Sequence, residues 1–555
     1  MSGRRIAILG GGMGGLTAAW RLSEPGWTDD FERITVYQRG ARLGGKAASS
    51  RGANGRIEEH GLHIWLGYYD NAFAMMRECY EELDRSTTRP SCPIRELDDA
   101  FSPSVDVGLM AHDDGAWSAW MGHFATNDLR PGDPGTPAFT PLDMVQRGLR
   151  LLDDLYQSLA PTVPAPVASM STSPTPPTVG DRSGLIGITA LAALDSLVGG
   201  FTDAFRLERS HSPDQQRLAH LVEVVVAQLR GIVADGLLLD PGRIRDLNDE
   251  DFMDWIIRHG ASEAAAHGTL VRGLYDLVFG FADGDTDRAG FGAGLGLFLS
   301  AKTFFDYKGA IFWKMAAGMG DVVIAPLYQA LLERGVEFEF FTRIDDLHLD
   351  TTDATSPTIS AIDVTRQAHV SGGPAAYRPL VDIRGLPCFS RELRTDQLDG
   401  RVPAAGTDSE IFESHWWPDE GASHETLRRG IDFDHVIFAI PVGMARHVTG
   451  ELSAVSDRWR AMVDGLGTVA TEALQLWIRP DESEARRTDC GRNGQRVHAT
   501  VRHVGVDAAA HRARTVARRR QAGNDRLLLF HHADRRHRPD DDRPGRRPCA
   551  GRRTR

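Results

Sequence analysis

The sequence predicts an α/β fold in which a discontinuous dinucleotide-binding domain with a parallel sheet is interrupted by a mainly helical (α+β) substrate domain. Three observations predict it. The chain opens with a short apolar strand, a glycine-rich turn and a helix, and a second strand, "RITVYQ", follows at a spacing that suits a βαβ unit. Amphipathic helical patterns then occupy residues 76–305. After them, helix and strand patterns return and end on a buried strand in "FDHVIFAIPVG".

The glycine-rich turn "GGGMGG" has the spacing Gly10-x-Gly12-x-x-Gly15, directly after a strand and at the start of a helix. Gly10 permits the tight turn, Gly12 lets the backbone approach a pyrophosphate, and Gly15 allows the helix to pack closely on the strand. The helix N-terminus, with Met13 and Gly14 in its first turn, supplies partial positive charge to the phosphates. In this context the pattern predicts a dinucleotide site rather than a structural glycine turn.

The end of the second strand adds a further set of candidate cofactor residues. An acidic residue normally stands there and holds the ribose hydroxyls, but this chain has Gln38, which can donate and accept hydrogen bonds without charge. The run Arg42-Leu-Gly44-Gly45-Lys46 follows within a few residues. Paired glycines flanked by cations suit a second approach of backbone to a pyrophosphate, with the cations countering its charge.

The middle of the chain is helical in pattern, as "QQRLAHLVEVVVAQLRGIV" and "DFMDWIIRHG" show. A segment rich in Pro, Ser and Thr at 161–184 cannot support a packed core and is expected to be an exposed loop. Residues 185–201, 271–281 and 290–305 are apolar enough to line a hydrophobic tunnel or a face that dips into a membrane. Ordinary helix packing explains each of these stretches equally well.

The run "RIEEHGLHIWLGYYDNAF" at 56–73 raises a question of chemistry, because it holds two glutamates and two histidines. A metal site needs a third convergent ligand, and no HExxH-like spacing is present, so we expect no metal at His60 and His63. Glu58 and Glu59 could serve as general bases, but an exposed charged turn is the commoner outcome. No residue can be named as a catalytic acid or base from the sequence.

Length and composition limit the classes of protein to consider. A chain of 555 residues is long enough for two or more domains. The net charge of −13 argues against a nucleic-acid partner. Five scattered cysteines without a CxxC pattern, and the lack of any stretch of about 18 apolar residues, predict a cytoplasmic protein that contacts a membrane at its surface if at all.

Three blocks, "GGGMGGLTAAWRL…VYQRGARLGGKAAS…GRIEEHGLHIWLGYYDNAF", resemble the FAD-dependent amine-oxidase/phytoene-desaturase superfamily, closest to the plant and cyanobacterial-type phytoene and zeta-carotene desaturases, with hydroxysqualene dehydroxylases nearby. The resemblance implies a Rossmann-like FAD-binding domain. It implies that Gly61, Leu62 and His63 lie against the isoalloxazine ring, and that Ile344 meets the adenine through its backbone. The bound partner is then FAD, and the substrate a lipophilic small molecule.

The expected reaction is desaturation, in which a hydride passes to the flavin from a C–H beside a double bond. A reductive dehydroxylation on the same scaffold is the alternative. The expected segments are a first FAD-binding part at 1–75, a helical substrate domain at 76–305, a second FAD-binding part at 306–365, a substrate-side insertion at 366–430 and a third FAD-binding part at 431–485.

Residues 486–555 differ from the rest, with about 20 arginines and no lysine. One interpretation is a disordered basic tail, and the other is a coding frame that has been lost. The resemblance implies a Gly-Asp motif here, opening a helix at the second phosphate, and no Gly-Asp pair occurs after residue 321. A degenerate flavoprotein, inactive through this loss, is therefore a further alternative.

Overall fold

The computed structural model gives the architecture of most of the chain. The structure describes residues 3–52, 55–59, 61, 63–113, 116–134, 139–159, 213–353, 356–400, 407–414, 417, 421–468, 471–478 and 526–533. The predicted loop at 161–184 and the apolar stretch at 185–201 lie outside the described residues. So does most of the arginine-rich segment.

A four-stranded parallel sheet forms the centre of the dinucleotide-binding part, in the order β10-β2-β1-β18. Its strands are β1 (Arg4–Leu9), β2 (Phe31–Tyr37), β10 (Glu337–Glu339) and β18 (His435–Phe438). The last four residues of both β1 and β2 are buried, as expected for strands covered on both faces. Because the four strands come from three distant parts of the chain, the predicted discontinuous, Rossmann-like α/β domain is confirmed.

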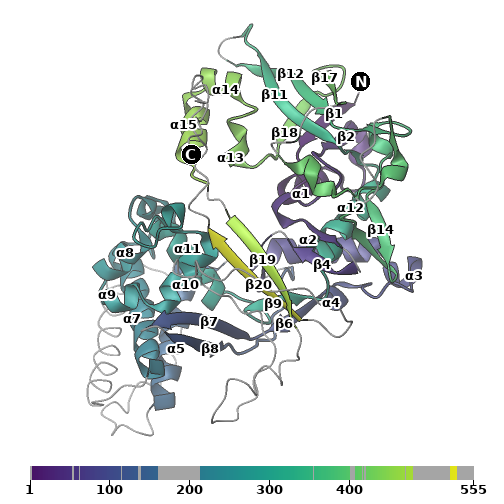
Figure 1. Ribbon diagram of the computed structural model, residues 1–555. Coiled ribbons are helices and arrows are strands. Elements are labelled where there is room, and N and C mark those ends of the chain that lie inside the picture. The colour runs from purple at the N-terminus through teal and green to yellow at the C-terminus, as the bar shows by residue number, and fades with distance from the viewer. Residues whose placement is uncertain are drawn as a thin grey trace, which may run out of the picture.

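Helices cover this sheet and join it to the rest of the molecule. They are α1 (Met13–Leu22), α2 (Asp70–Leu83) and α12 (Ala325–Glu333), which share one apolar core with the sheet (Figure 1). The expected boundary at residue 75 falls inside α2. The Tyr80 hydroxyl of α2 donates to the Val322 carbonyl at 2.9 Å, so all of α2 packs with the dinucleotide-binding part.

The segment at 366–430 also packs against this core. We expected it on the substrate side, but Tyr377, Phe389 and Phe412 are buried in the core of the dinucleotide-binding part. Phe412 contacts Phe341 with 5.1 Å between ring centroids, and Tyr328 of α12 packs on Phe389.

A second layer of strands lies beyond the parallel sheet. The strands β11 (Thr342–Asp350), β12 (Thr358–Arg366) and β17 (Ser423–Arg428) form an antiparallel sheet. Its apolar face packs on Ala7, Leu9 and Tyr37 from the parallel sheet. Three short helices, α13 (Val442–Ala445), α14 (Gly450–Val455) and α15 (Asp457–Gly465), follow β18 and lie beside it in Figure 1.

The helical region has its own apolar core. Its helices are α5 (Pro141–Leu159), α7 (Pro213–Ala234), α8 (Phe252–Arg258), α9 (Glu263–Ala266), α10 (Thr269–Val278) and α11 (Ala293–Phe305). The helical patterns seen in the sequence for α7, α8, α10 and α11 are confirmed.

Short antiparallel sheets lie between the two regions in Figure 1. One has the order β5-β9-β6, with strands β5 (Trp65–Leu66), β6 (Phe101–Ser104) and β9 (Phe312–Met315). The pair β7 (Asp106–Asp113) and β8 (Ala116–His123) forms a hairpin. The strand β19 (Thr471–Ile478) pairs with β20 (Arg526–Ala533), which comes from the arginine-rich segment, where we expected no regular structure.

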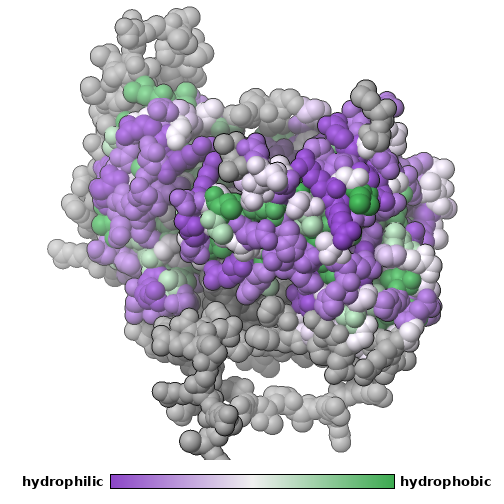
Figure 2. Space-filling view, turned by 90° about the horizontal axis from the view of Figure 1, so that it is seen from above, coloured by the Kyte–Doolittle hydropathy of each residue, from purple (hydrophilic) through white to green (hydrophobic). Residues whose placement is uncertain are grey.

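The remaining described elements are short: α3 (Arg85–Thr88), α4 (Leu97–Ala100), β3 (Ser49–Arg51), β4 (Ile57–Glu59), β13 (His369–Val370), β14 (Leu380–Ile383), β15 (Leu386–Phe389), β16 (Leu398–Asp399), a π-helical turn η7 (Gly320–Ile324), and the 3-10 turns η1 (Trp27–Asp29), η2 (Gly45–Ala47), η5 (Pro241–Asp249), η6 (Ala282–Gly284), η8 (Pro374–Ala376), η9 (Thr395–Gln397) and η10 (Ser409–Glu413). On the face drawn in Figure 2, hydrophilic residues predominate and hydrophobic ones form small separate groups. Among the helices that the structure describes, none has the length and apolarity needed to cross a bilayer.

The His348 side chain links α14 to the antiparallel sheet of β11, β12 and β17. The two ring nitrogens of His348 contact Glu451 of α14 at 2.9 Å and Asp363 of β12 at 2.8 Å. The hydrogen bonds to Asp363 and Glu451 raise the pKa of His348 to about 9. Because the folded-state pKa is raised above the ordinary value, this contribution to stability is complete below about pH 6.5 and is lost as the pH rises through about 9.

We therefore expect His348→Gln to lower the thermal unfolding temperature at pH 6 and to leave it unchanged at pH 10. The measurement is a pair of thermal melts of each chain at the two pH values. An equal loss at both would show that the ring contributes by packing and not by its charge.

Candidate functional site

The first glycine turn has the close contacts that its pattern predicts. Gly10 has a φ of +110°, and a Cβ there would lie 2.8 Å from the carbonyl oxygen of Ala439. A Cβ at Gly15 would lie 1.9 Å from the carbonyl oxygen of Gly10. A Cβ at Gly12, by contrast, would meet no protein atom closer than 3.9 Å. The protein itself does not require glycine at this position, which fits a bound group that approaches the backbone there.

The second glycine loop lies directly beside the first. Gly44 has a φ of +108°, its N–H donates to the Gly11 carbonyl at 2.9 Å, and it forms a parallel bridge with Gly12. Gly45 and Lys46 are exposed next to this bridge. No side chain caps the N-terminus of α1, and its first turn, with Met13 and Gly14, holds no acidic residue. The two loops and the helix end form a cradle that suits an anionic group such as a pyrophosphate.

Gln38 is buried, with 8% exposure, and both ends of its side-chain amide contact backbone groups. Its Oε1 accepts from the Gly11 N–H at 2.9 Å, and its Nε2 donates to the Arg39 carbonyl at 2.5 Å. The predicted ribose contact is untested. The structure instead gives Gln38 a part in holding the first glycine loop.

This arrangement predicts that Gln38→Leu destabilises the site, because it leaves the buried Gly11 N–H without an acceptor. The expected loss in the free energy of unfolding is about 1–3 kcal/mol, measured by urea denaturation. Gln38→Glu retains the acceptor oxygen and is the matched control, with a smaller loss. Equal stability of the Leu variant and the parent chain would contradict this role.

Arg42 does not face solvent, and its guanidinium is already paired. Its Nε and Nη2 bind Glu413 at 2.6 and 3.0 Å, and its Nη1 lies 3.1 Å from both Glu410 and the Ser50 hydroxyl. Burial lowers the pKa of the Arg42 guanidinium, but the hydrogen bonds and charges of the two glutamates outweigh it, and the pKa is raised. We expected a cation that counters a pyrophosphate. The structure shows a cation that fastens the second glycine loop to η10.

The run at 56–63 places one of its acid–base pairs inside the molecule. His63 Nδ1 lies 2.6 Å from Glu59 Oε2, and each side chain is only 8% exposed. The exposed charged turn that we expected is therefore wrong for Glu59. Glu58 is partly exposed and pairs with Arg391 at 2.9 Å. His60 and Leu62 lie outside the described residues. In the described part of the chain, no group of three or more His, Cys, Asp or Glu side chains is arranged to hold a metal ion.

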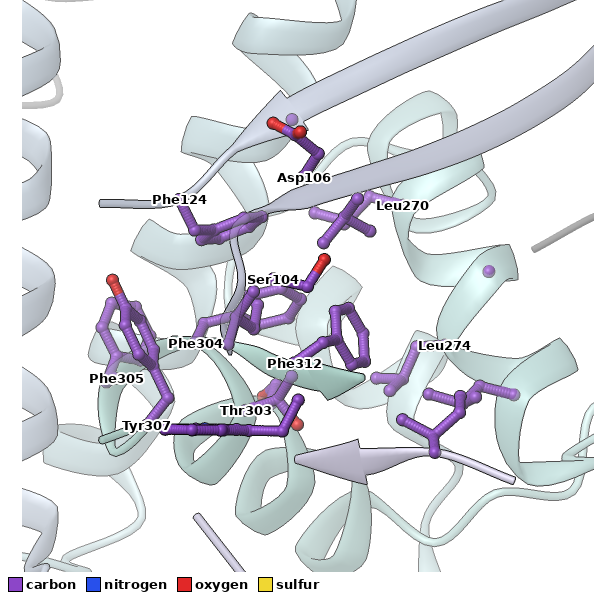
Figure 3. A pocket seen from close by; sticks show the side chains of 18 of the residues that line it. Ser104, Asp106, Phe124, Leu270, Leu274, Thr303, Phe304, Phe305, Tyr307 and Phe312 are labelled. Atoms are coloured by element: carbon purple, nitrogen blue, oxygen red, sulfur yellow. The ribbon is translucent and has the colours of Figure 1, made fainter. Parts of the chain in front are cut away.

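A large cavity begins beside this pair. It has a volume of about 1000 Å³ and extends from Gly61 and His63 into the helical region. Figure 3 shows side chains from several elements around it. The apolar and aromatic residues among its lining include Phe124, Leu270, Leu274, Phe304, Phe305, Tyr307, Phe312 and Trp313.

The walls combine predicted and unpredicted parts of the chain. The expected apolar stretches at 271–281 and 290–305 contribute α10, through Leu274, and α11, through Phe304. The sequence did not point to Ser104, at the end of β6, or to Phe124, directly after β8, which both line the cavity. Phe124 stacks on Phe304 with 5.9 Å between ring centroids. The aromatic residues near the hairpin are the only sequence feature that could have predicted this part of the cavity lining.

Ile344 lies in β11. It stands opposite Val364 of β12 and is 9% exposed, in the cluster that includes Leu9 and Tyr37. Its backbone therefore forms part of an antiparallel ladder at the end of the parallel sheet. The predicted contact with an adenine stays a prediction.

Comparison with known proteins agrees with this geometry at the N-terminus. A sequence model described as the NAD(P)-binding Rossmann-like domain matches residues 8–79. Similar proteins include 15-cis-phytoene desaturase of Synechococcus elongatus, 39% identical over 74 residues, which are 13% of this chain and 15% of that protein. Zeta-carotene desaturase of Arabidopsis thaliana is 28% identical over 169 residues, which are 27% of this chain and 28% of that protein. The resemblance seen in the sequence is confirmed over these residues.

The chain thus matches only about 15% of the length of the first of these relatives. Among solved structures, an oxidoreductase from Methanosarcina mazei gives a TM-score of 0.36 at 10% identity, over 85% of this chain and 68% of that chain. Reduced UDP-galactopyranose mutase gives 0.33 at 12% identity, over 86% and 63%. At these values the likeness carries no argument about function.

Proposed function

We propose that this chain, whose N-terminal region is similar to phytoene and zeta-carotene desaturases, is an FAD-dependent oxidoreductase that acts on a lipophilic isoprenoid-type substrate. One observation carries the proposal. The cavity of about 1000 Å³ is bounded at one end by Gly61 and His63, and the His63 ring contacts the loop that holds Gly44 and Gly45. A dinucleotide bound in the glycine cradle would therefore lie next to the apolar cavity.

The residues of the cradle fit FAD. Gly12, Gly44 and Gly45 would lie along the pyrophosphate, with the N-terminus of α1 supplying partial positive charge. Gln38 would lie beneath the first loop, where it already binds Gly11. His63 and Gly61 would stand between the pyrophosphate and the cavity. The chemistry that bound FAD would contribute is the acceptance of a hydride from a carbon beside a double bond.

The rest of the site supplies shape and exclusion of water. The lining is mainly apolar and aromatic, which suits a long hydrocarbon and strengthens electrostatic interactions within the chamber. Two of its buried polar side chains pair with each other, since the Ser300 hydroxyl donates to Gln228 Oε1 at 2.5 Å. Loss of a proton next to the hydride donor completes a new double bond, and we assign no dedicated base to it. The names of the relatives favour this direction over reductive dehydroxylation.

The test is anaerobic mixing of the FAD-loaded full chain with 15-cis-phytoene or zeta-carotene in detergent. We expect the visible flavin band to bleach and a product with one more double bond to form. Squalane, which offers no C–H beside a double bond, is the matched control and should leave the band unchanged. A band that persists with both polyenes would overturn the proposed desaturation, and a chain that takes up no FAD would indicate a degenerate flavoprotein.

A further inference from the structure

A buried histidine–carboxylate pair stands where the second glycine loop meets the cavity. His63 Nε2 lies 3.1 Å from the carbonyl oxygen of Lys46, directly after the paired glycines. Its Nδ1 lies 2.6 Å from Glu59 Oε2. The other oxygen of Glu59 accepts from the Met319 N–H at 3.1 Å, beside the π-helical turn η7. Three separate parts of the chain therefore fix the position of the ring.

The partners of the ring indicate its protonation state. A carbonyl oxygen can only accept a hydrogen bond, so the contact with Lys46 requires a proton on Nε2. The contact with Glu59 requires a second proton between Nδ1 and the carboxylate. The ordinary pKa values, about 6.5 for histidine and about 4.3 for glutamate, place that proton on the ring. His63 is then an imidazolium, with both nitrogens donating.

The electrostatic surroundings agree with this assignment. Burial lowers the pKa of His63, but the hydrogen bond and charge of Glu59 outweigh burial, and the net pKa is raised. Glu59 faces the ring from β4, and Lys46 faces it through its backbone at η2. The other titratable or cationic side chains that line the same cavity are Asp106, His123, Arg147, Arg150, Tyr307 and Lys314. Glu59 is in direct contact with the His63 ring, at 2.6 Å.

We propose that His63 is a fixed positive charge that stabilises the reduced cofactor, and that Glu59 is the positioning residue that keeps it charged. This inference rests on the proposed function. Bound FAD would gain one negative charge on accepting a hydride, which carries two electrons and one proton, while the substrate would lose the hydride and then a neighbouring proton to solvent. A preorganised cation next to the site where negative charge develops favours the reduced state.

The first test needs no cofactor. Histidine-labelled NMR of the full chain, with the His63 signal assigned by its loss in His63→Gln, should show an imidazolium that titrates above pH 6.5. In Glu59→Gln the same ring should titrate below that value, because burial then outweighs the hydrogen bond to the Lys46 carbonyl. Glutamine retains an acceptor for Met319, which favours folding of the variant. A parent-chain ring that titrates at or below its ordinary pKa overturns the proposal even if the variant fails to fold.

A matched control exists on the protein surface. His267 and Glu263 have the same spacing of four residues and a 3.3 Å contact, but their side chains are 59% and 77% exposed. Glu263→Gln should change neither the titration of His63 nor any property of the cofactor.

The second test uses the FAD-loaded chain and measures its reduction midpoint potential. We expect Glu59→Gln to weaken binding of reduced relative to oxidised FAD about tenfold, which lowers the potential by about 30 mV for a two-electron couple. An unchanged potential in a variant whose ring has lost its charge overturns the proposal and leaves the proposed function standing. A chain that binds no FAD overturns both, and the NMR result then stands alone as a statement about the ring.

Discussion

Gly15→Ala is expected to abolish tight FAD binding and to destabilise the dinucleotide-binding part. The added Cβ would lie 1.9 Å from the Gly10 carbonyl oxygen and 3.3 Å from Cγ2 of Ile8, both on or next to β1. Because backbone atoms block it, α1 must move away from the sheet. Overpacking of this kind costs about 1–3 kcal/mol in stability. Moving the helix N-terminus should also weaken FAD binding about 100-fold, or about 3 kcal/mol.

The measurements are urea denaturation and a titration of each chain with FAD. Gly14→Ala is the matched control for stability, because a Cβ there would meet no atom within 4 Å and the position lies in the same helix. Alanine should be neutral or slightly stabilising at that position. Equal stability of the two variants would contradict the close packing of α1 on β1.

Arg42→Met is expected to lower the free energy of unfolding by about 3 kcal/mol, since it breaks a buried ion pair from one side. Arg42 is 2% exposed, while Glu413 and Glu410 are about one-third exposed, at 31% and 35%. Water can partly resolvate the two carboxylates, so we place the loss at the lower end of the range for buried pairs. The substitution also removes the contacts between the second glycine loop and η10. FAD binding should weaken as a result.

The control for Arg42 is Arg460→Met. Arg460 pairs with Asp457 on α15, but these side chains are 48% and 93% exposed. Exposed pairs contribute at most about 1 kcal/mol. Chemical denaturation of the two variants should therefore give clearly different losses. Similar small losses would mean that the glutamates do not hold the Arg42 side chain in the buried position.

Local patterns in the sequence were enough to predict the parallel sheet and the first glycine turn. The strand, turn and helix around Gly10 and Gly15 are consecutive, and their close contacts follow from backbone geometry within a few residues. The helices of the middle region were predictable for the same reason, because each carries its own apolar face. The family resemblance added the position of Gly61 and His63, which the structure places at the edge of the cavity.

Contacts between distant residues were not predictable. Arg42 was expected to face a phosphate, but its partners lie about 370 residues away in η10, and no local pattern specifies that pairing. Glu59 was expected to be exposed, but Met319 and His63 enclose it. Phe124 directly follows β8, and no local pattern in the sequence places it against the cavity.

The most direct test of the central claim is the visible absorbance spectrum of the purified full chain after mixing with FAD and gel filtration. We expect flavin bands that remain with the protein, and that are lost in Gly15→Ala but kept in the exposed control Arg460→Met. A colourless protein fraction from the parent chain would contradict the assignment of the glycine cradle and its neighbouring cavity as a flavin site.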